Sequence, residues 1–371
     1  MSKRIFIAIG AFLLSVMTVT ASFAQQKQNQ AGAVYVMTNA PGGNEVVAFN
    51  RDARGMLTFM DSYTTQGLGS GGAAVDPLGS QGSLILSQDK RWLLAVNAGS
   101  NEISVYQVGP DGLDLADVVD SGGEFPVSLT LYHDLLYVLN AGTGAESPNI
   151  VGFKLSHRGK LTRLDDSIRE LGNGGFHQVG FDPQGNILMI TQGEPGGTNA
   201  ILVFSVDENG LPDAIPVTSP SEGEVPFGFI FDQRGHLLVS EAGSGAVSSY
   251  EILGDDSLRS ISSSIENGQA ATCWIAGNSR GLVYTANTGS GTISGYKLQS
   301  GKGRLVLLDA AAGSGNAPID LTTTGNGLFL YVLNASAGTL GIFRIKPDGS
   351  LQDLGVMGGL PSPFAQGIVG R

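Results

Sequence analysis

Residues 319–357 read IDLTTT-GNG-LFLYVLN-ASAG-TLGIFRI-KPDGS-LQDLGVM, which is four short apolar runs separated by three turns. The runs are rich in Leu, Ile, Val, Phe and Tyr, and they partly alternate with polar residues. Such runs are typical of β-strands, and the Gly, Asn, Asp and Ser between them are typical of hairpin turns. The stretch therefore predicts a four-stranded antiparallel sheet.

The same pattern recurs along the chain. In each copy the second run ends in a polar residue, which we call the turn position. It is a carboxamide in every copy except the fifth, which has a glutamate. The turn positions are Asn39, Asn97, Asn140, Gln192, Glu241, Asn287 and Asn334. Their spacing is near the period of about 40–50 residues that is typical of propeller blades.

Seven copies of four strands, with few helical stretches, predict an all-β fold: a seven-bladed β-propeller over residues 32–371. The alternation excludes a helical solenoid, and the regular spacing disfavours a β-sandwich. The chain begins with a second strand, AVYVMTN (33–39), and ends with SPFAQGIVGR (362–371), which matches the first strands of other copies. We expect this C-terminal strand to pair with the N-terminal blade and close the ring, because closure removes two open sheet edges.

The N-terminus predicts export. MSKR is followed by an apolar run over residues 5–19 and by the small residues Ser22 and Ala24, which together predict a secretory signal peptide over residues 1–24. A retained N-terminal anchor is the alternative. Residues 25–31 are expected to be a disordered leader. We expect a monomer that is periplasmic or secreted, with no membrane span in the mature chain.

Composition narrows the partners and the chemistry. The net charge is −12 and the chain has no blocks of Lys and Arg, which disfavours nucleic acid as a partner. The single cysteine, Cys273, lies in the apolar run TCWIA and is expected to be a buried packing residue. No Cys/His cluster with metal-ligand spacing is present, so we predict neither a metal nor a cofactor.

One histidine stands where a ligand could bind. In a propeller the first strand of each blade lines the central channel, and its start lies beside the end of the second strand. His177, in GGFHQVGF (174–181), falls at such a start, and Glu241 ends the second strand of the next copy. An imidazole and a carboxylate that meet in a cleft can form a general acid/base pair. The alternatives are a histidine bonded to neighbouring backbone and a solvated glutamate.

Other polar residues are expected near the same face. The stretch DPLGSQGSL (76–84) offers Ser80, Gln81 and backbone amides, and Gln178 and Gln192 belong to the copy that holds His177. These groups could bind an oxygen-rich ligand, but loop structure explains them equally well. The asparagines at the other turn positions are expected to satisfy backbone groups in tight turns.

Two segments carry a family resemblance. FHQVGFDPQGN (176–186) and EVPFGFIFDQRGHLLVSEAGSGAVSSY (224–250) resemble the seven-bladed propeller lactonase family, which includes 6-phosphogluconolactonase-type and carboxymuconate-cyclase-type members. The resemblance extends over residues 32–371. It implies that His177 and Glu241 match the active-site histidine and glutamate of the family. It also implies arginines at two positions where this chain has Phe227 and Trp274.

The resemblance implies a hydrolase that acts on a small lactone or sugar-like ligand. Glu241 would be the general base, and His177 the electrophile or acid. Without the two arginines, which clamp carboxylates and phosphates, the lactone is expected to be non-phosphorylated. A muconate-type cycloisomerase is less favoured. The predicted substrate-binding residues are Phe227, Trp274, Gln178, Ser80, Gln81 and Gln192. The alternative is a catalytically inactive secreted propeller that binds a ligand or a protein.

The export prediction is tested by N-terminal sequencing of the native protein. Cleavage after Ala24 leaves a chain that begins at Gln25, because small residues precede that bond. A cytosolic pool that begins at Met1 or Ser2 would contradict the prediction.

Overall fold

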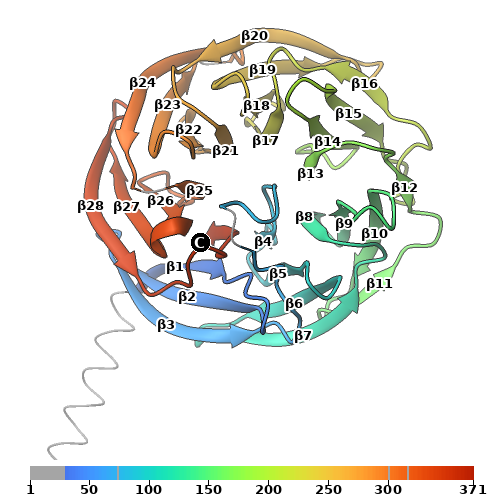
Figure 1. The fold of residues 1–371 in the computed structure, drawn as a ribbon, viewed down its shortest axis with the longest axis horizontal. Helices are drawn as coiled ribbons and strands as arrows, with labels where there is room; N and C mark the ends of the chain where they lie inside the picture. The colour runs from blue at the N-terminus through green and yellow to red at the C-terminus, as the bar shows by residue number, and fades with distance from the viewer. Residues whose placement is uncertain (1–29, 73–74, 300, 316) are drawn as a thin grey trace, which may run out of the picture.

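The computed structural model describes residues 30–72, 75–299, 301–315 and 317–371. It arranges them as seven antiparallel sheets around a central axis (Figure 1). The predicted seven-bladed propeller is thus confirmed. The predicted signal peptide and residues 25–29 of the predicted leader lie outside the described residues. The first strand begins at Gln30, two residues before the expected start of the propeller.

Each blade begins with an innermost strand at the central channel and ends with an outermost strand at the rim of the ring. From the channel outward, blade 1 contains β29 (Ile368–Gly370), β1 (Gln30–Met37), β2 (Glu45–Asp52) and β3 (Leu57–Thr64). Blade 2 contains β4 (Leu84–Leu86), β5 (Trp92–Asn97), β6 (Glu102–Val108) and β7 (Leu113–Asp120). Blade 3 contains β8 (Pro126–Tyr132), β9 (Leu135–Asn140), β10 (Asn149–Leu155) and two short outer strands, β11 (Leu161–Arg163) and β12 (Arg169–Glu170).

Blade 4 contains β13 (Phe176–Phe181), β14 (Ile187–Gly193), β15 (Asn199–Ser205) and β16 (Val217–Pro220). Blade 5 contains β17 (Pro226–Phe231), β18 (Leu237–Glu241), β19 (Ala246–Ile252) and β20 (Leu258–Glu266). Blade 6 contains β21 (Thr272–Gly277), β22 (Leu282–Asn287), β23 (Thr292–Leu298) and β24 (Leu305–Gly313). Blade 7 contains β25 (Pro318–Thr323), β26 (Phe329–Asn334), β27 (Thr339–Ile345) and β28 (Leu351–Gly358).

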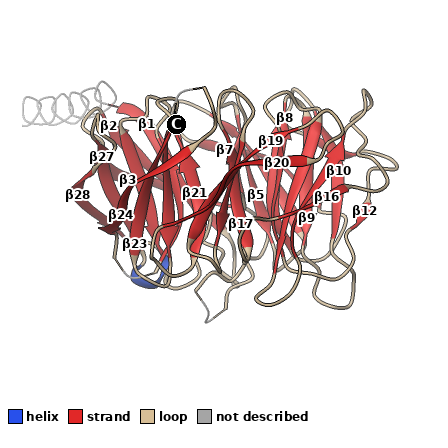
Figure 2. Cartoon of the chain, turned by 90° about the horizontal axis from the view of Figure 1, so that it is seen from above, coloured by secondary structure: helices blue, strands red, loops and turns tan. Residues whose placement is uncertain are grey.

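The two faces of the ring carry different turns. The turn positions lie on the face marked by the short helix η1 (Ala335–Ala337), which is at the bottom of Figure 2 and which we call the lower face. The turns between the first and second strands, and between the third and fourth, lie on the opposite, upper face. Among the described residues, no helix is long and apolar enough to cross a membrane.

The C-terminal strand closes the ring as predicted. β29 pairs antiparallel with β1, with Tyr35 opposite Val369. The Arg371 N–H donates to the Ala33 carbonyl at 2.9 Å, and the Met37 N–H donates to the Gly367 carbonyl at 3.1 Å. Blade 1 is therefore built from both ends of the chain.

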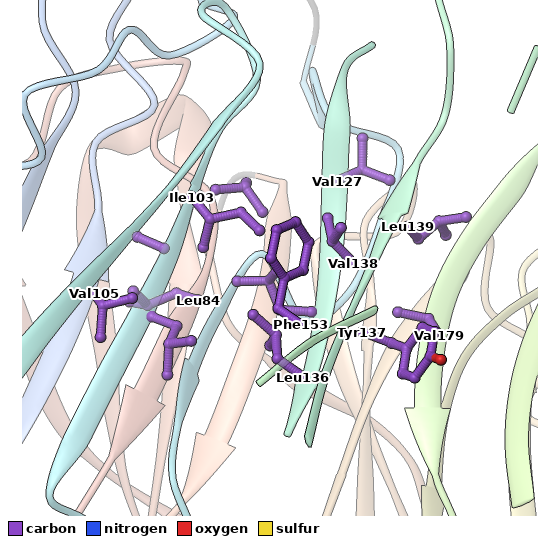
Figure 3. Packing of buried hydrophobic residues seen from close by; sticks show 14 of the residues in the cluster. Leu84, Ile103, Val105, Val127, Leu136, Tyr137, Val138, Leu139, Phe153 and Val179 are labelled. Carbon is purple, nitrogen blue, oxygen red and sulfur yellow. The ribbon is translucent and has the colours of Figure 1, made fainter. Parts of the chain in front are cut away.

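Apolar contacts between neighbouring blades form most of the core. The second strands are almost wholly buried, and all six residues of β5, β9, β22 and β26 are buried. Figure 3 shows side chains of blades 2, 3 and 4, among them Leu84, Val138 and Val179, filling the space between these sheets.

Buried tyrosines add a repeated polar link between blades. The hydroxyl of a second-strand tyrosine donates to a glycine carbonyl in an outer turn of the following blade. The pairs are Tyr137 with Gly210 (2.7 Å), Tyr284 with Gly349 (2.8 Å) and Tyr331 with Gly55 (2.8 Å). The last of these joins blade 7 to blade 1, so it supports the same closure as β29.

Deletion of residues 364–371 is expected to abolish cooperative thermal unfolding or to cause aggregation. The deletion exposes the edge of β1 and removes Ile368, which is buried in the core. Calorimetry and light scattering would measure both effects. Val356→Ser, at a side chain that is 67% exposed, is the control and should unfold like the wild type. A truncated protein that melts like the full chain would contradict the prediction.

Candidate functional site

His177 is presented to the channel by a bulge. In blade 4, Phe176 pairs with Gln192 and Gln178 pairs with Thr191, so the register shifts at His177. An extra residue of this kind bends the strand and re-aims its side chain. The first strands of blades 3, 5, 6 and 7 show a similar shift at the same end. The residues within these shifts are Val127 in blade 3, Phe227 and Gly228 in blade 5, Cys273 in blade 6, and Ile319 and Asp320 in blade 7.

Both ring nitrogens of His177 face backbone carbonyls. Nδ1 lies 2.7 Å from the Gly79 oxygen, and Nε2 lies 2.9 Å from the Gly193 oxygen. A neutral imidazole carries one N–H and can donate to only one of them, whereas the protonated ring can donate to both. The half-buried ring also stacks on Phe227, with centroids 4.5 Å apart. Phe227 in turn meets the edge of Trp274 at 5.0 Å.

The loop that carries Gly79 enters the centre of the ring. Residues 75–82, which we call the channel loop, lie between β3 and β4 and turn inward before β4 begins (Figure 1). The Ser80 carbonyl accepts hydrogen bonds from Trp274 Nε1 (2.9 Å) and Gln366 Nε2 (3.0 Å). The Ser80 hydroxyl donates to the Val127 carbonyl at 2.8 Å, and the Gln81 N–H donates to the His177 carbonyl at 3.1 Å. The loop thus contacts blades 1, 3, 4 and 6.

Gln178 and Gln81, two of the predicted substrate-binding residues, form hydrogen bonds with the backbone of innermost strands. Gln178 bonds both backbone groups of Phe229 on β17, accepting at 2.7 Å and donating at 3.0 Å. Gln81 does the same for Ile275 on β21, at 2.9 and 3.1 Å. Gly228, the β17 counterpart of Gln178, has no side chain, and a Cβ there would lie 2.3 Å from Gln81 Oε1. Gln81 therefore takes the place of a side chain that blade 5 lacks.

Glu241 is enclosed within blade 5. Its side chain is fully buried, and Pro226 lies opposite it in the sheet. Three hydroxyls donate to the carboxylate: those of Ser248 (2.6 Å), Ser264 (2.8 Å) and Ser221 (3.3 Å). Burial raises the pKa of Glu241 above its ordinary value, and the three serine hydrogen bonds act in the opposite direction.

Glu241 holds the same structural position as the carboxamides. Asn97 donates to the Ser104 hydroxyl at 2.8 Å and Asn287 donates to the Ser294 hydroxyl at 2.9 Å, each seven residues along, as Ser248 is from Glu241. Glu241 therefore takes part in the same turn network as the carboxamides of the other blades. A carboxylate fits because hydroxyls surround it, and a hydroxyl can donate as readily as it accepts.

His177 and Glu241 lie on the lower face of neighbouring blades, but no hydrogen bond joins them. The contacts that connect them run through backbone. The Gly193 carbonyl lies 2.9 Å from His177 Nε2, and a Cβ added to Gly193 would lie 2.8 Å from Pro226, which lies opposite Glu241. Gln192 is also apart, since its amide donates to the Asn173 carbonyl at 3.3 Å. The structure thus brings together His177, Phe227, Trp274, Ser80 and Gln81. Glu241 and Gln192 instead form hydrogen bonds near the lower ends of their own blades.

The sequence model of the family described as "Lactonase, 7-bladed beta-propeller" matches residues 34–176 and 241–363. The chain belongs to this family. The matched residues of this lactonase-family propeller include Glu241 and Trp274 but not the segment 177–240, which holds His177 and Phe227. No curated protein sequence matches the chain.

Solved structures share the fold of this lactonase-family propeller at low identity. The periplasmic gluconolactonase PpgL of Pseudomonas aeruginosa is 18% identical, with a TM-score of 0.71 over 91% of this chain and 98% of that one. A Bacteroides fragilis protein, assigned provisionally as a 6-phosphogluconolactonase, is 18% identical, with a TM-score of 0.71 over 92% and 98%. A Lactobacillus plantarum protein is 17% identical, with a TM-score of 0.72 over 92% and 99%.

Two channel carboxyls were missed by the sequence reasoning. Asp320 is 5% exposed and accepts from the Leu321 and Ile368 N–H groups. Asp76, in the channel loop, accepts from Gln366 Nε2 at 2.6 Å and from the Gly79 N–H at 2.9 Å. Burial raises the pKa of each to about 7, and the charge of Asp320 adds to the shift of Asp76. Both have a positive φ, which is uncommon outside glycine.

The remaining candidates are accounted for. Cys273 is a buried packing residue, as predicted, and burial raises the pKa of its thiol. Within the described part of the chain, no group of three or more His, Cys, Asp or Glu residues is placed to hold a metal ion.

Stability is expected to fall between pH 5 and pH 8. Asp76 and Asp320 each have a pKa of about 7 in the folded protein, compared with the ordinary value of 3.8. Between these two values the folded protein keeps the protons, whereas the unfolded chain has lost them. The free energy of unfolding therefore decreases as the pH rises toward the pKa of the folded state, because the folded protein must then also lose these protons. The melting temperature should therefore be lower at pH 8 than at pH 5, and the slope should be smaller in the variant Asp76→Asn/Asp320→Asn.

The quantity to compare is the slope of melting temperature against pH. Replacing a carboxyl by a carboxamide also removes one hydrogen-bond acceptor, which changes stability at every pH but does not change this slope. Asp348→Asn is the control: the pKa of this exposed carboxyl is lowered, so its ionisation lies below the tested range. A double variant with the slope of the wild type would contradict the assignment.

Proposed function

We propose that the protein hydrolyses a small uncharged lactone at the lower end of its central channel. The observation that carries the proposal is the imidazole of His177, half-buried and presented by a bulge into the channel of a lactonase-family propeller. The neighbouring blade supplies Glu241, whose raised pKa makes it a stronger base near neutral pH than an ordinary carboxylate.

The aromatic surroundings favour an uncharged substrate. Phe227 is 4% exposed and Trp274 is fully buried, at the positions where the resemblance implies arginines. Rings in these positions offer no partner for a phosphate or a carboxylate, and an unpaired charge is costly to bury. A neutral lactone ring can instead lie against the stacked pair of His177 and Phe227.

In the proposed reaction, water attacks the lactone carbonyl carbon and the ring C–O bond breaks. Glu241 takes a proton from the attacking water, and a His177 N–H polarises the carbonyl and gives a proton to the departing ring oxygen. The product is an open hydroxy acid. The proposal requires the substrate to displace the Gly79 carbonyl from His177, and water to replace a serine at Glu241.

The enclosed state of Glu241 favours a second candidate. A propeller that binds a ligand without catalysis needs no accessible base, and here the carboxylate is fully buried while both nitrogens of His177 are occupied. The two candidates differ in whether a bound lactone is turned over.

The test is acid release by the purified protein from a panel of uncharged γ- and δ-lactones, measured by pH-stat. Loss of a positioned acid or base typically lowers the rate by about 10²–10⁴, so His177→Ala and Glu241→Gln should each do so. The double variant should be far less than multiplicative, because the two groups act as a unit. His157→Ala, at an exposed turn, should leave the rate unchanged.

The other outcomes are also informative. Full activity in Glu241→Gln, with loss in His177→Ala, would restrict Glu241 to its structural role. If calorimetry shows that a lactone binds but no acid is released, the protein is a ligand-binding propeller and not a lactone hydrolase.

A further inference from the structure

The upper face holds a cleft that is separate from the His177 site. Its volume is about 1060 Å³, and it lies between blades 5, 6 and 7. The first hairpin turns of these three blades form it, together with the outer turn of blade 6 (Figure 1, from β17 to β28). His177 and the turn positions are on the opposite face. The size is that of a site for a drug-sized molecule.

Apolar side chains form the floor and outer wall of the cleft. Leu238 and Val283 belong to the core cluster between blades 5 and 6 and are fully or nearly fully buried. On the outer strand β24, Val306 is 39% exposed and Leu308 is 40% exposed. These two side chains remain in contact with water in the free protein, so covering them with apolar atoms would favour binding.

The rim of the cleft is cationic in a chain whose net charge is −12. Arg234 and Arg280 lie in the first hairpin turns of blades 5 and 6, Lys297 lies near the end of β23, and all three are exposed. None of them forms an ion pair with a carboxylate among the described residues. The Gly327 carbonyl orients Arg280 by accepting from Nη2, and the other guanidinium N–H groups can serve a ligand.

Among the described residues that line the cleft, Asp232 is the only carboxylate, and its oxygens already accept hydrogen bonds. Asp232 accepts from the backbone N–H groups of Arg234 (2.8 Å) and His236 (2.9 Å), and its second oxygen lies 2.7 Å from His236 Nδ1. It therefore closes its own turn and forms no ion pair with Arg234, Arg280 or Lys297. The described lining thus carries three positive side chains and one negative side chain, so its charge is complementary to that of an anion.

We propose that this cleft binds a small amphipathic anion. Its carboxylate, sulfonate or phosphate group is held by Arg234, Arg280 and Lys297, and its apolar body covers Val306 and Leu308. The site goes beyond lactone hydrolysis and does not depend on it, because none of the residues that line the cleft belongs to the His177 site.

The probe for the test is anilinonaphthalene sulfonate, an amphipathic anion, with N-phenylnaphthylamine as its uncharged analogue. Fluorescence titration of the purified protein should show one site that binds the sulfonate at least about tenfold more tightly than the amine. The triple variant Arg234→Gln/Arg280→Gln/Lys297→Gln should weaken sulfonate binding at least about tenfold and leave amine binding unchanged. Val306→Asp should weaken binding of both probes.

The matched control removes the same charge elsewhere. Arg158→Gln/Arg163→Gln/Lys346→Gln changes three exposed cations that do not line the cleft, two in blade 3 and one in the outer turn of blade 7, and should bind both probes like the wild type. Melting temperatures of all variants establish that they are folded. Equal sulfonate binding by wild type and cleft variant, or equal weakening in the control, would overturn the proposal. So would co-sedimentation with anionic phospholipid vesicles that depends on the three cleft cations, since the ligand would then be a membrane.

Discussion

Each innermost strand of this propeller turns one edge toward the channel, and the backbone groups of that edge need partners. Side chains of the neighbouring blade supply several of them: the Ser128 hydroxyl accepts from Val179, Gln178 bonds Phe229, and the Asp320 carboxylate accepts from Ile368. Where Gly228 leaves a gap, Gln81 reaches across from the channel loop. Buried backbone groups without partners are costly, so these links determine what can occupy the channel.

The same requirement explains why the predicted site residues are engaged. His177 links the channel loop to blade 4 through the Gly79 carbonyl, and Trp274 links it to blade 6 through the Ser80 carbonyl. A residue that could act on a ligand here therefore also stabilises the loop. In the proposed reaction the substrate displaces the Gly79 carbonyl from His177, so the stability of the channel loop would affect substrate binding.

The two faces of the ring differ in how their polar groups are used. On the lower face, hydroxyl and carboxamide groups form hydrogen bonds with one another around the turn positions. The carboxylate of Glu241 belongs to the same kind of network, because three serine hydroxyls donate to it. On the upper face, three cations at the cleft have no carboxylate partner among the described residues. Satisfied groups stabilise the fold, whereas the unpaired ones are available to a ligand.

The sequence by itself determined the number of blades, the strands of each blade and the closure by the C-terminal strand. These follow from alternation, turn residues and a fixed period, which are local properties repeated along the chain. It also pointed to His177, because a strand start is a local feature. Only the tertiary structure decided that Gln81 binds Ile275, 194 residues away, that serines enclose Glu241, and that Asp76 and Asp320 share one channel. The contacts of Gln81, Asp76 and Asp320 depend on which segments meet at the axis, and the serines reach Glu241 only when the strands of blade 5 pair. No local sequence pattern specifies either arrangement.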